Sequence, residues 1–324
     1  MIKNAFVTGA TGFLGKHLLN ELDAQGWQIT AIHRNILPQE LTQMAVNWVQ
    51  ASLDDVVALQ NAMPAEPFVI FHLAADTTQW KPNYPRQTRT NVDGTRNVLE
   101  AARNNRVQRM IHVSSIAAFG PHDTVINEKT PSIALQSGRN YAVTKWQAEE
   151  MVRNAVANGD IEAVIINPCH ILGPGDTQNW IQIFKAVKED KLPGIPPAWG
   201  NFGYVTEMAK AMVTAADKGQ IGENYLLGGP HVAFLHVIQE AQRQLGKPVS
   251  KKASPPWLFK LVEPAMRLAS MVTGKEPQLT PDKVKLIIHK LNVDDTKART
   301  ALNYKHLSLE EMVSRTLAWM QEND

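Results

Sequence analysis

The chain has 324 residues, 44% hydrophobic and 20% charged, a composition typical of a globular protein with a sizeable core. Its net charge of +2 gives no argument for a nucleic-acid partner, and its single cysteine, Cys169, excludes an internal disulfide. No apolar run approaches the roughly 18 residues of a membrane span, no signal peptide precedes the first apolar segment, and no metal-ligand spacing is present. We therefore expect a cytoplasmic protein without a metal.

The first segment predicts a strand, a glycine-rich turn and a helix. Residues 5–7 are apolar, and residues 16–22 have helical periodicity. The turn between them contains Gly9, Thr11, Gly12, Phe13, Leu14 and Gly15. Glycines in this context permit a tight turn, close approach of a diphosphate, and close packing of helix on strand. An ordinary glycine turn is the alternative, but the flanking elements favour a dinucleotide site.

A second strand is predicted at residues 28–32, and its end bears on cofactor choice. A carboxylate about 20 residues past the glycines binds the ribose 2′-hydroxyl of NAD in such sites. This chain has His33 and Arg34 there instead, and a guanidinium pairs with a 2′-phosphate through a planar fork. We expect NADP to be preferred, with NAD as the second option. The alternative is that Arg34 is a solvated loop residue that selects nothing.

Further strands are predicted at residues 46–49, 67–75, 109–115 and 161–166, separated by helices at about 55–62, 86–104 and 139–157. This alternation favours right-handed βαβ units and a doubly wound parallel sheet. Segment 67–75 is apolar throughout, as in a central strand that is buried on both faces. His72 within it is expected to be a hydrogen-bonded core residue.

After Pro168 the alternation stops, and prolines and tryptophans become frequent. We predict a smaller mixed α/β lobe over the carboxyl edge of the sheet. The predicted domains are a nucleotide-binding domain at 1–170, with return segments around 202–230, and a substrate-binding lobe at 171–324. The return includes a helix at 205–219 and a late strand at 224–227.

Residues 254–273 predict a helix, with Ser254 as its cap and a kink at Pro264. The residues assigned to its apolar face are Leu258, Leu261, Val262, Ala265, Met266, Ala269 and Val272. Two interpretations stay open. Such stripes usually bury against protein, which favours a lid or core helix of the second lobe. The other interpretation is a helix that lies on a membrane surface.

Tyr141, Lys145 and Ser115 are the candidate catalytic side chains. Tyr141 and Lys145 are four residues apart at the start of a predicted helix, so they share a face. A nearby ammonium lowers the pKa of a phenol, which then exchanges a proton with a carbonyl or alcohol oxygen. Lys145 also has donors for the ribose hydroxyls. Because parallel strand ends meet at one crevice, we expect Ser115 to hydrogen-bond the same substrate oxygen.

Taken together, these motifs resemble the extended short-chain dehydrogenases/reductases, that is, the NAD(P)-dependent epimerase/dehydratase family in its dihydroflavonol-reductase-like branch. The resemblance rests on TGATGFLG at 8–15, HLAA at 72–75, NVDGT at 91–95, VSSIAAFG at 113–120, YAVTK at 141–145 and NPCHILGP at 167–174. It implies a Rossmann fold, with Tyr141 as acid/base, Lys145 as its activator and Ser115 as the partner of the substrate oxygen. It also implies that Asn91 supports the helix and a water chain behind them.

The same resemblance implies further cofactor contacts beyond the glycine turn and Arg34. These are Leu53, Leu73, Ala74, Ala75, Val113, Tyr141, Lys145, Pro168, His170 and Ile171. Two positions depart from the family pattern. Asn167 stands where many relatives keep an arginine, which favours the reductase branch, and Ser52 stands where many keep an aspartate for the adenine.

We therefore expect an NADP-dependent reductase of a ketone or aldehyde, in which the nicotinamide supplies hydride and Tyr141 the proton. The substrate is expected to be small and apolar or aromatic, and a homodimer is left open. The predicted pocket residues are Asp76, Trp80, Phe119, His170, Trp180 and Tyr204.

Two other functions stay open. One is an NAD-dependent nucleotide-sugar epimerase or dehydratase, with Lys185, Lys188 and Lys191 on the diphosphate. The other is a non-catalytic NADP-binding regulator, which the retained tyrosine and lysine disfavour. Cys169 is expected to be structural, and the lysines at 247, 251 and 252 are expected to form a solvated patch.

Overall fold

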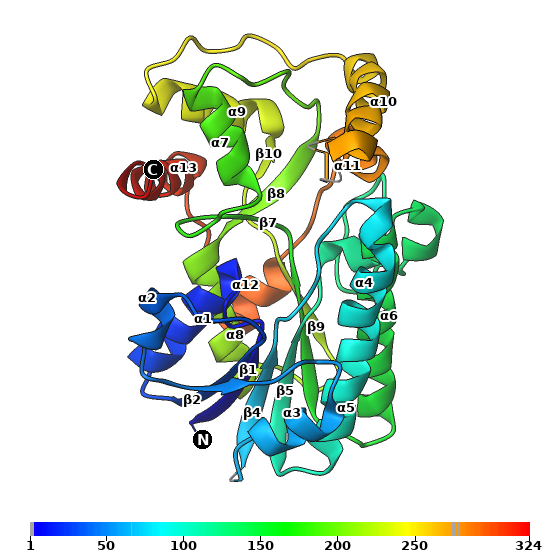
Figure 1. Cartoon of the computed structure of the whole chain (residues 1–324), viewed down its shortest axis with the longest axis vertical. Helices are drawn as coiled ribbons and strands as arrows, with labels where there is room; N and C mark the ends of the chain where they lie inside the picture. The colour runs from blue at the N-terminus through cyan, green and yellow to red at the C-terminus, as the bar shows by residue number, and fades with distance from the viewer. Residues whose placement is uncertain (1–2, 66, 274–275, 278) are drawn as a thin grey trace.

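The computed structural model describes residues 3–65, 67–273, 276–277 and 279–324. Two lobes are stacked along the long axis of the molecule (Figure 1). The larger lobe holds the N-terminus and the main sheet, and the smaller lobe holds the C-terminal helix.

The main sheet has seven strands in the order β3-β2-β1-β4-β5-β6-β9, and all neighbours are parallel. The strands are β1 (Asn4–Thr8), β2 (Gln28–His33), β3 (Val46–Gln50), β4 (Phe68–His72), β5 (Val107–Val113), β6 (Ala163–Pro168) and β9 (Asn224–Leu227). The chain order reverses between β1 and β4, which places a ligand crevice at the carboxyl ends of these strands. The predicted doubly wound parallel sheet is confirmed.

Helices cover both faces of this sheet (Figure 1). One face carries α1 (Phe13–Ala24), α8 (Val205–Lys218) and α12 (Thr296–Leu302), and the other carries α3 (Val56–Ala62), α4 (Tyr84–Thr88), α5 (Gly94–Arg103) and α6 (Asn140–Ala157). Successive strand residues alternate between the two cores. Val7 packs with α1 and α8, whereas Phe6 packs with α5 and α6. A short helix, α2 (Gln39–Thr42), follows β2.

The predicted helix at 86–104 differs from the observed chain in one respect. The 3-10 turn Lys81–Asn83 leads into α4, and the π-helical turn Arg89–Asp93 separates α4 from α5. A π turn contains one residue more than an α turn, so it shifts which side chains face inward. Asn91 lies in this turn and is buried. Two further 3-10 turns, Ile116–Phe119 and Ala134–Ser137, precede α6.

The smaller lobe contains a three-stranded sheet in the order β10-β8-β7, formed by β7 (His170–Leu172), β8 (Trp199–Tyr204) and β10 (His231–Ala233). Helices α7 (Trp180–Lys188), α9 (Phe234–Gln244) and α13 (Leu309–Glu322) share an apolar core with this sheet. Helices α10 (Pro256–Thr273) and α11 (Pro281–Ile287) lie on the other side of the lobe. Segments α8, β9 and α12 return to the main sheet, and the boundary at residue 170 stays a prediction.

Helix α10 does not have the single apolar face assigned from the sequence. Leu258, Val262 and Met266 are half-buried, as the assignment expects, whereas Leu261, at the margin of the assigned face, is 67% exposed. The side chains of Ala265, Ala269 and Val272 lie outside the described residues. Ser254 was expected to cap this helix, but its Oγ atom accepts a hydrogen bond from the backbone nitrogen of Ile195.

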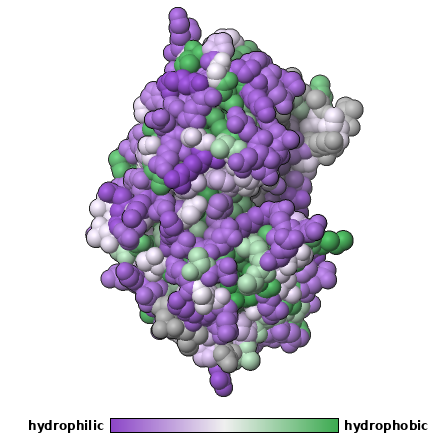
Figure 2. All heavy atoms as spheres, turned by 90° about the vertical axis from the view of Figure 1, so that its left-hand side faces the viewer, coloured by the Kyte–Doolittle hydropathy of each residue, from purple (hydrophilic) through white to green (hydrophobic). Residues whose placement is uncertain are grey.

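Among the described residues, none of the helices combines the length and hydropathy that crossing a bilayer requires. The face of the molecule shown in Figure 2 is mostly hydrophilic, with apolar residues in small scattered groups. This is the side on which α1, α2 and α13 lie in Figure 1.

Candidate active site

The glycine turn packs directly against the exit of β4. Gly9 has a φ of +75°, and a Cβ atom there would lie 2.5 Å from the backbone nitrogen of Ala74. At Gly15 a Cβ atom would lie 2.2 Å from the carbonyl oxygen of Gly9. Helix α1 starts after Gly12 without a side-chain cap, so its first amides face the turn. These features fit a dinucleotide diphosphate, which needs backbone at close range and the positive end of a helix.

A cavity of about 1670 Å³ lies between the two lobes at the carboxyl edge of the sheet. Residues from both lobes line it, including Phe13, Arg34, Ser115 and Tyr141 from the larger lobe. This volume exceeds the roughly 300–1,000 Å³ of a typical small-ligand pocket. The cavity is therefore large enough for a dinucleotide together with a substrate.

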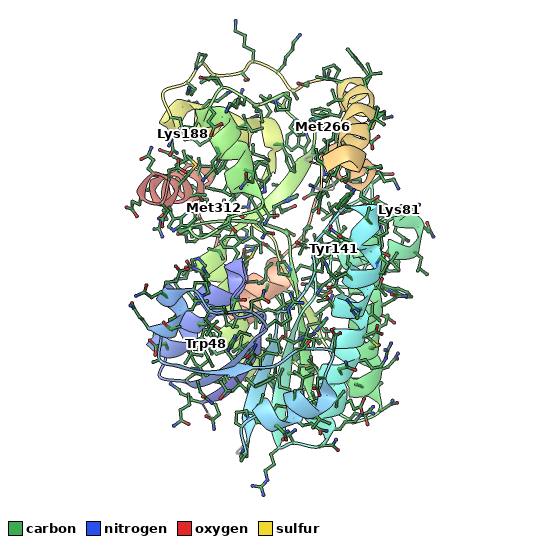
Figure 3. All side chains as sticks on the ribbon, viewed as in Figure 1. Trp48, Lys81, Tyr141, Lys188, Met266 and Met312 are labelled. Atoms are coloured by element: carbon green, nitrogen blue, oxygen red, sulfur yellow. The ribbon has the colours of Figure 1, made fainter. Side chains whose placement is uncertain are left out.

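Two of the three candidate catalytic side chains, Ser115 and Tyr141, line this cavity, and Lys145 is buried on the same helix as Tyr141. Hydrogen bonding by the Ser115 side chain acts to lower the pKa of the Tyr141 phenol. The Ser115 Oγ atom also accepts a hydrogen bond from the Ala117 backbone nitrogen at 3.2 Å. One turn along α6, Lys145 donates from Nζ to the Val113 carbonyl oxygen at 2.8 Å. Tyr141 lies where the two lobes meet (Figure 3). Ser115 and Tyr141 thus lie at the wall of the same cavity.

The electrostatics of this group are dominated by burial. Burial raises the pKa of Tyr141, while the Ser115 hydrogen bond and the positive charge of Arg139 act in the opposite direction. Burial also lowers the pKa of Lys145 to about 8, against the raising effect of the Glu149 carboxylate. The lysine is directed at the Val113 carbonyl, and the nearby cation that favours the phenolate is Arg139. Acidification of Tyr141 by Lys145 therefore stays a prediction.

Asn91 connects the loop after β4 to α6. Its Oδ1 atom accepts a hydrogen bond from the Asp76 backbone nitrogen at 2.7 Å, and its Nδ2 atom donates to the Asp76 carbonyl at 3.0 Å. The same Nδ2 atom donates to Thr144 Oγ1 at 3.1 Å, next to Lys145. Asn91 is 2% exposed. Its hydrogen bonds therefore join the loop after β4 to helix α6.

His72 is a core histidine, as the sequence predicts. Its ring nitrogens contact Thr8 Oγ1 at 2.7 Å and Thr95 Oγ1 at 3.0 Å. Burial lowers its pKa to about 3, so the ring is neutral at ordinary pH. The contact fixes the end of β4 against β1, at the point where the glycine turn begins.

The remaining residues expected at the cofactor fall into two groups. Phe13, Arg34, Ala75, His170 and Ile171 line the cavity. Arg34 is exposed, and its guanidinium has no hydrogen-bond or ion-pair partner among the described residues. The residues of the other group are not among the described residues that line the cavity. Val113 and Pro168 are buried at the ends of β5 and β6, and Leu53 is buried before α3. Leu73 and Ala74 are half-buried at the exit of β4.

Three of the six predicted pocket residues, Asp76, His170 and Trp180, line the cavity. The His170 ring stacks on Phe202 with ring centroids 5.0 Å apart, and Trp180 packs against both rings. Burial lowers the pKa of His170 to about 4, so this wall is aromatic and neutral.

Trp80, Phe119 and Tyr204 are not among the described residues that line the cavity. Phe119 packs with Ile116 and Ile126 in a separate core cluster, and Tyr204 belongs to the core of the smaller lobe. Trp80 is half-buried in the loop after β4.

The structure adds one cation that sequence analysis missed. Arg139 precedes α6, lines the cavity and donates from Nη2 to Gln79 Oε1 at 3.3 Å. Its Nε atom is buried without a hydrogen-bond partner among the described residues. Arg139 stands two residues before Tyr141, and that proximity was the available signal. A donor at this place suits a substrate that carries a hydrogen-bond acceptor.

Contacts distant in sequence close the site on the other side. The Tyr84 hydroxyl donates to Asp282 Oδ2 at 2.6 Å, and Thr78 Oγ1 donates to Glu276 Oε2 at 2.8 Å. Lys285 Nζ reaches the Gly138 carbonyl at 3.1 Å. These bonds tie α11 and the residues before it to the larger lobe.

Neither a thiol nucleophile nor a metal centre emerges from the described residues. Cys169 is half-buried, and burial raises the pKa of its thiol, so it is not an activated nucleophile. Over the described residues, no three His, Cys, Asp or Glu side chains gather to hold a metal ion.

Comparison with known proteins agrees with this geometry. The model of the NAD dependent epimerase/dehydratase family matches residues 5–228, which include the glycine turn and the serine, tyrosine and lysine. The chain belongs to this family. It is accordingly an NAD(P)-dependent enzyme, which sets aside the alternative of a non-catalytic regulator.

Members of the family that resemble this chain differ in activity. A Synechocystis sp. protein with the provisional name dihydroflavonol 4-reductase is 28% identical over 98% of this chain and 94% of its own length. A Stigmatella aurantiaca protein named as a 4-hydroxy-2-methyl-3-oxo-4-farnesyl-3,4-dihydroquinoline-1-oxide ketoreductase is 30% identical over 86% of this chain and 89% of its own. The solved UDP-glucuronic acid 4-epimerase of Bacillus cereus, in complex with UDP-glucuronic acid and NAD, has the same fold. Its TM-score is 0.79 at 22% identity, covering 99% of this chain and 100% of that one.

Proposed function

We propose that this protein is an NADP-dependent reductase of a ketone or aldehyde in a small, apolar or aromatic substrate. The observation that carries the proposal is that Ser115 and Tyr141 line the same cavity, another wall of which is aromatic. The names of two relatives, a reductase and a ketoreductase, support the direction of the reaction.

Several residues would hold the cofactor. The glycine turn and the first amides of α1 would bind the diphosphate, because they combine close backbone with the positive helix end. Arg34 would pair with the 2′-phosphate of NADP, since His33 and Arg34 stand at the end of β2 in place of a carboxylate. When bound, the reduced nicotinamide supplies the hydride.

The chain's own side chains would handle the proton. Tyr141 would donate its phenolic proton to the carbonyl oxygen of the substrate. Ser115 would hydrogen-bond the same oxygen and keep the phenol oriented. Lys145, anchored on the Val113 carbonyl, would stabilise the phenolate that remains. Asn91 would hold the loop at Asp76 against α6 throughout the reaction.

The second candidate function is a nucleotide-sugar epimerase, since the family includes them. It requires free cations for a sugar-linked diphosphate. Lys185 and Lys191 line the cavity, but Lys185 and Lys188 pair with Asp324 at 2.8 and 2.6 Å, and Lys191 pairs with Glu189 at 2.8 Å. These two carboxylates offset two of the three positive charges that the epimerase function would use, so we favour the reductase.

The two functions differ in cofactor balance. The decisive experiment offers the purified protein a panel of carbonyl compounds with NADPH and NADH in parallel, and a panel of UDP-sugars without added cofactor. The reductase consumes NADPH in step with carbonyl loss. An epimerase interconverts UDP-sugars with no net cofactor change and carries tightly held NAD through purification, and that result would overturn the proposal.

A further inference from the structure

Helix α10 has two apolar faces, and only one of them is used by the fold. Leu258, Val262 and Met266 line the cavity between the lobes, and Figure 3 shows Met266 on α10 at that end of the molecule. On the same helix, Trp257 is 59% exposed, and Leu261 and Leu268 are each 67% exposed. Soluble proteins rarely leave several large apolar side chains together in water without a use for them.

Helical geometry places the exposed apolar residues on one line. At about 100° per residue, positions 257, 261, 264 and 268 fall within an arc of about 60°. Positions 258, 262 and 266 are centred about 130° away from this arc, and their side chains line the cavity. We call Trp257, Leu261, Pro264 and Leu268 the outer face of α10. All four are exposed.

Positive charge borders this face. The stretch between Glu240 and Glu263 contains five basic residues, of which Arg243 pairs with Glu240 and Lys247 pairs with Asp190. Lys251 and Lys252 are exposed just before the helix, and Lys260 is exposed at the edge of its outer face. None of the three has an ion-pair partner among the described residues. The segment and the helix lie at the end of the smaller lobe (Figure 1).

We propose that the outer face of α10 docks on the surface of an anionic lipid bilayer. Trp257, Leu261 and Leu268 would enter the boundary between headgroups and acyl chains, as in helices that lie in the membrane plane. Lys251, Lys252 and Lys260 would face the anionic headgroups. The helix lies on the membrane and does not cross it, in accord with the absence of a spanning helix among the described residues.

A second copy of this chain fits the outer face less well. A two-fold contact pairs each surface patch with itself. It would bring the lysines beside the outer face of one copy close to the same lysines of the other, without acidic partners. A bilayer instead offers acyl chains to the apolar outer face and anionic headgroups to the neighbouring lysines.

A docked α10 would also place the cavity lining next to the lipid, and so favour lipophilic carbonyl substrates. This last step alone rests on the proposed function.

Co-sedimentation of the whole protein with vesicles tests the docking without any turnover. One set of vesicles contains equal parts phosphatidylglycerol and phosphatidylcholine, and the other contains phosphatidylcholine alone. We expect the wild type to partition to the anionic set. The triple variant Trp257→Ser, Leu261→Ser, Leu268→Ser should lose at least tenfold in partition coefficient while it still binds NADPH. Lys251→Gln with Lys252→Gln should lose roughly 25-fold on the anionic vesicles, at about fivefold per lysine.

The matched control removes exposed apolar side chains elsewhere. Val57 and Leu135 are 64% and 62% exposed, and Val57→Ser with Leu135→Ser should leave the partition unchanged. The proposal fails if the wild type stays in solution with both vesicle sets, or if the triple variant sediments like the wild type. It also fails if the wild type is a dimer that the triple variant dissociates, because the face would then be a subunit interface.

Discussion

Lys145 and Val113 are joined by a 2.8 Å hydrogen bond from the lysine Nζ atom to the backbone carbonyl at the end of β5. The lysine is 3% exposed, and burial lowers its pKa from 10.5 to about 8. A lysine whose pKa is lower in the folded chain than in the unfolded chain destabilises the fold at neutral pH. That cost disappears as the pH rises from the folded pKa to the unfolded one.

Lys145→Met should therefore change how stability depends on pH. Between pH 8 and 10.5 only the unfolded wild type keeps this proton, so the wild type gains about 3 kcal/mol relative to the variant over that range. Urea unfolding of both proteins between pH 7 and pH 10.5 measures the change. Lys305→Met, at an exposed lysine, is the control. A difference between wild type and Lys145→Met that is constant with pH would show that the lysine is not shifted by burial.

Gly9 and Gly26 provide a matched pair of substitutions. Both have positive φ angles, +75° and +73°, but a Cβ atom meets Ala74 at 2.5 Å in the first case and nothing within 4 Å in the second. Gly26→Ala should cost only the backbone strain, about 1 kcal/mol. Gly9→Ala should cost at least about 2 kcal/mol more and abolish NADPH binding, because the exit of β4 must move. Urea unfolding and fluorescence titration with NADPH measure the two effects. Equal losses in both variants would argue against a close-packed turn.

Asn91→Ala should impair catalysis although Asn91 does not line the cavity. The substitution removes three hydrogen bonds that hold the Asp76 backbone and Thr144. We expect the free energy of unfolding to fall by about 2 kcal/mol. We also expect kcat to fall roughly tenfold, because the Asp76 loop and α6 would shift relative to each other and misalign the reacting groups. The control is Asn105→Ala, which removes a bond from Asn105 Nδ2 to the Ala101 carbonyl far from the site. If both variants keep full kcat, Asn91 has only a structural role.

Arg34→Ala should reduce activity with NADPH much more than activity with NADH. Loss of a charge-assisted contact to the 2′-phosphate should lower kcat/KM for NADPH by roughly 10- to 100-fold. The value for NADH should change less than about threefold, since NADH lacks that phosphate. Arg106→Ala, at an exposed arginine before β5, controls for a general loss of positive charge. An equal loss with both cofactors would mean that Arg34 does not read the phosphate.

Much of the fold was predictable because buried parallel strands are short apolar runs. Segments 5–7 and 67–75 each became a central strand, and the glycines between strand and helix marked the turn. The π turn at Asn91 was not predictable, since it adds one residue without a sequence signal. The two faces of α10 were missed because apolar periodicity does not say which face meets protein.

Site residues were predictable where a reactive side chain stands at the end of a predicted strand or the start of a predicted helix. Ser115 and Tyr141 were linked because strand and helix ends converge in a parallel sheet, and in the structure both line the cavity. The aromatic residues of the pocket were harder to choose. Phe119 stands in a loop after a strand, but its ring turns into a local core. Contacts such as Tyr84 with Asp282 join residues 198 positions apart, which no local pattern reports.

The central claim is that the Tyr141 phenol transfers the proton. Its most direct test is steady-state reduction of an accepted carbonyl compound by Tyr141→Phe with NADPH. The control is Tyr225→Phe, at a phenol that accepts a hydrogen bond from the Gln220 backbone nitrogen. Loss of a positioned acid should lower kcat of Tyr141→Phe at least about 100-fold. NADPH binding and the activity of Tyr225→Phe should stay within about threefold of the wild type. A Tyr141→Phe enzyme with wild-type kcat would contradict the account.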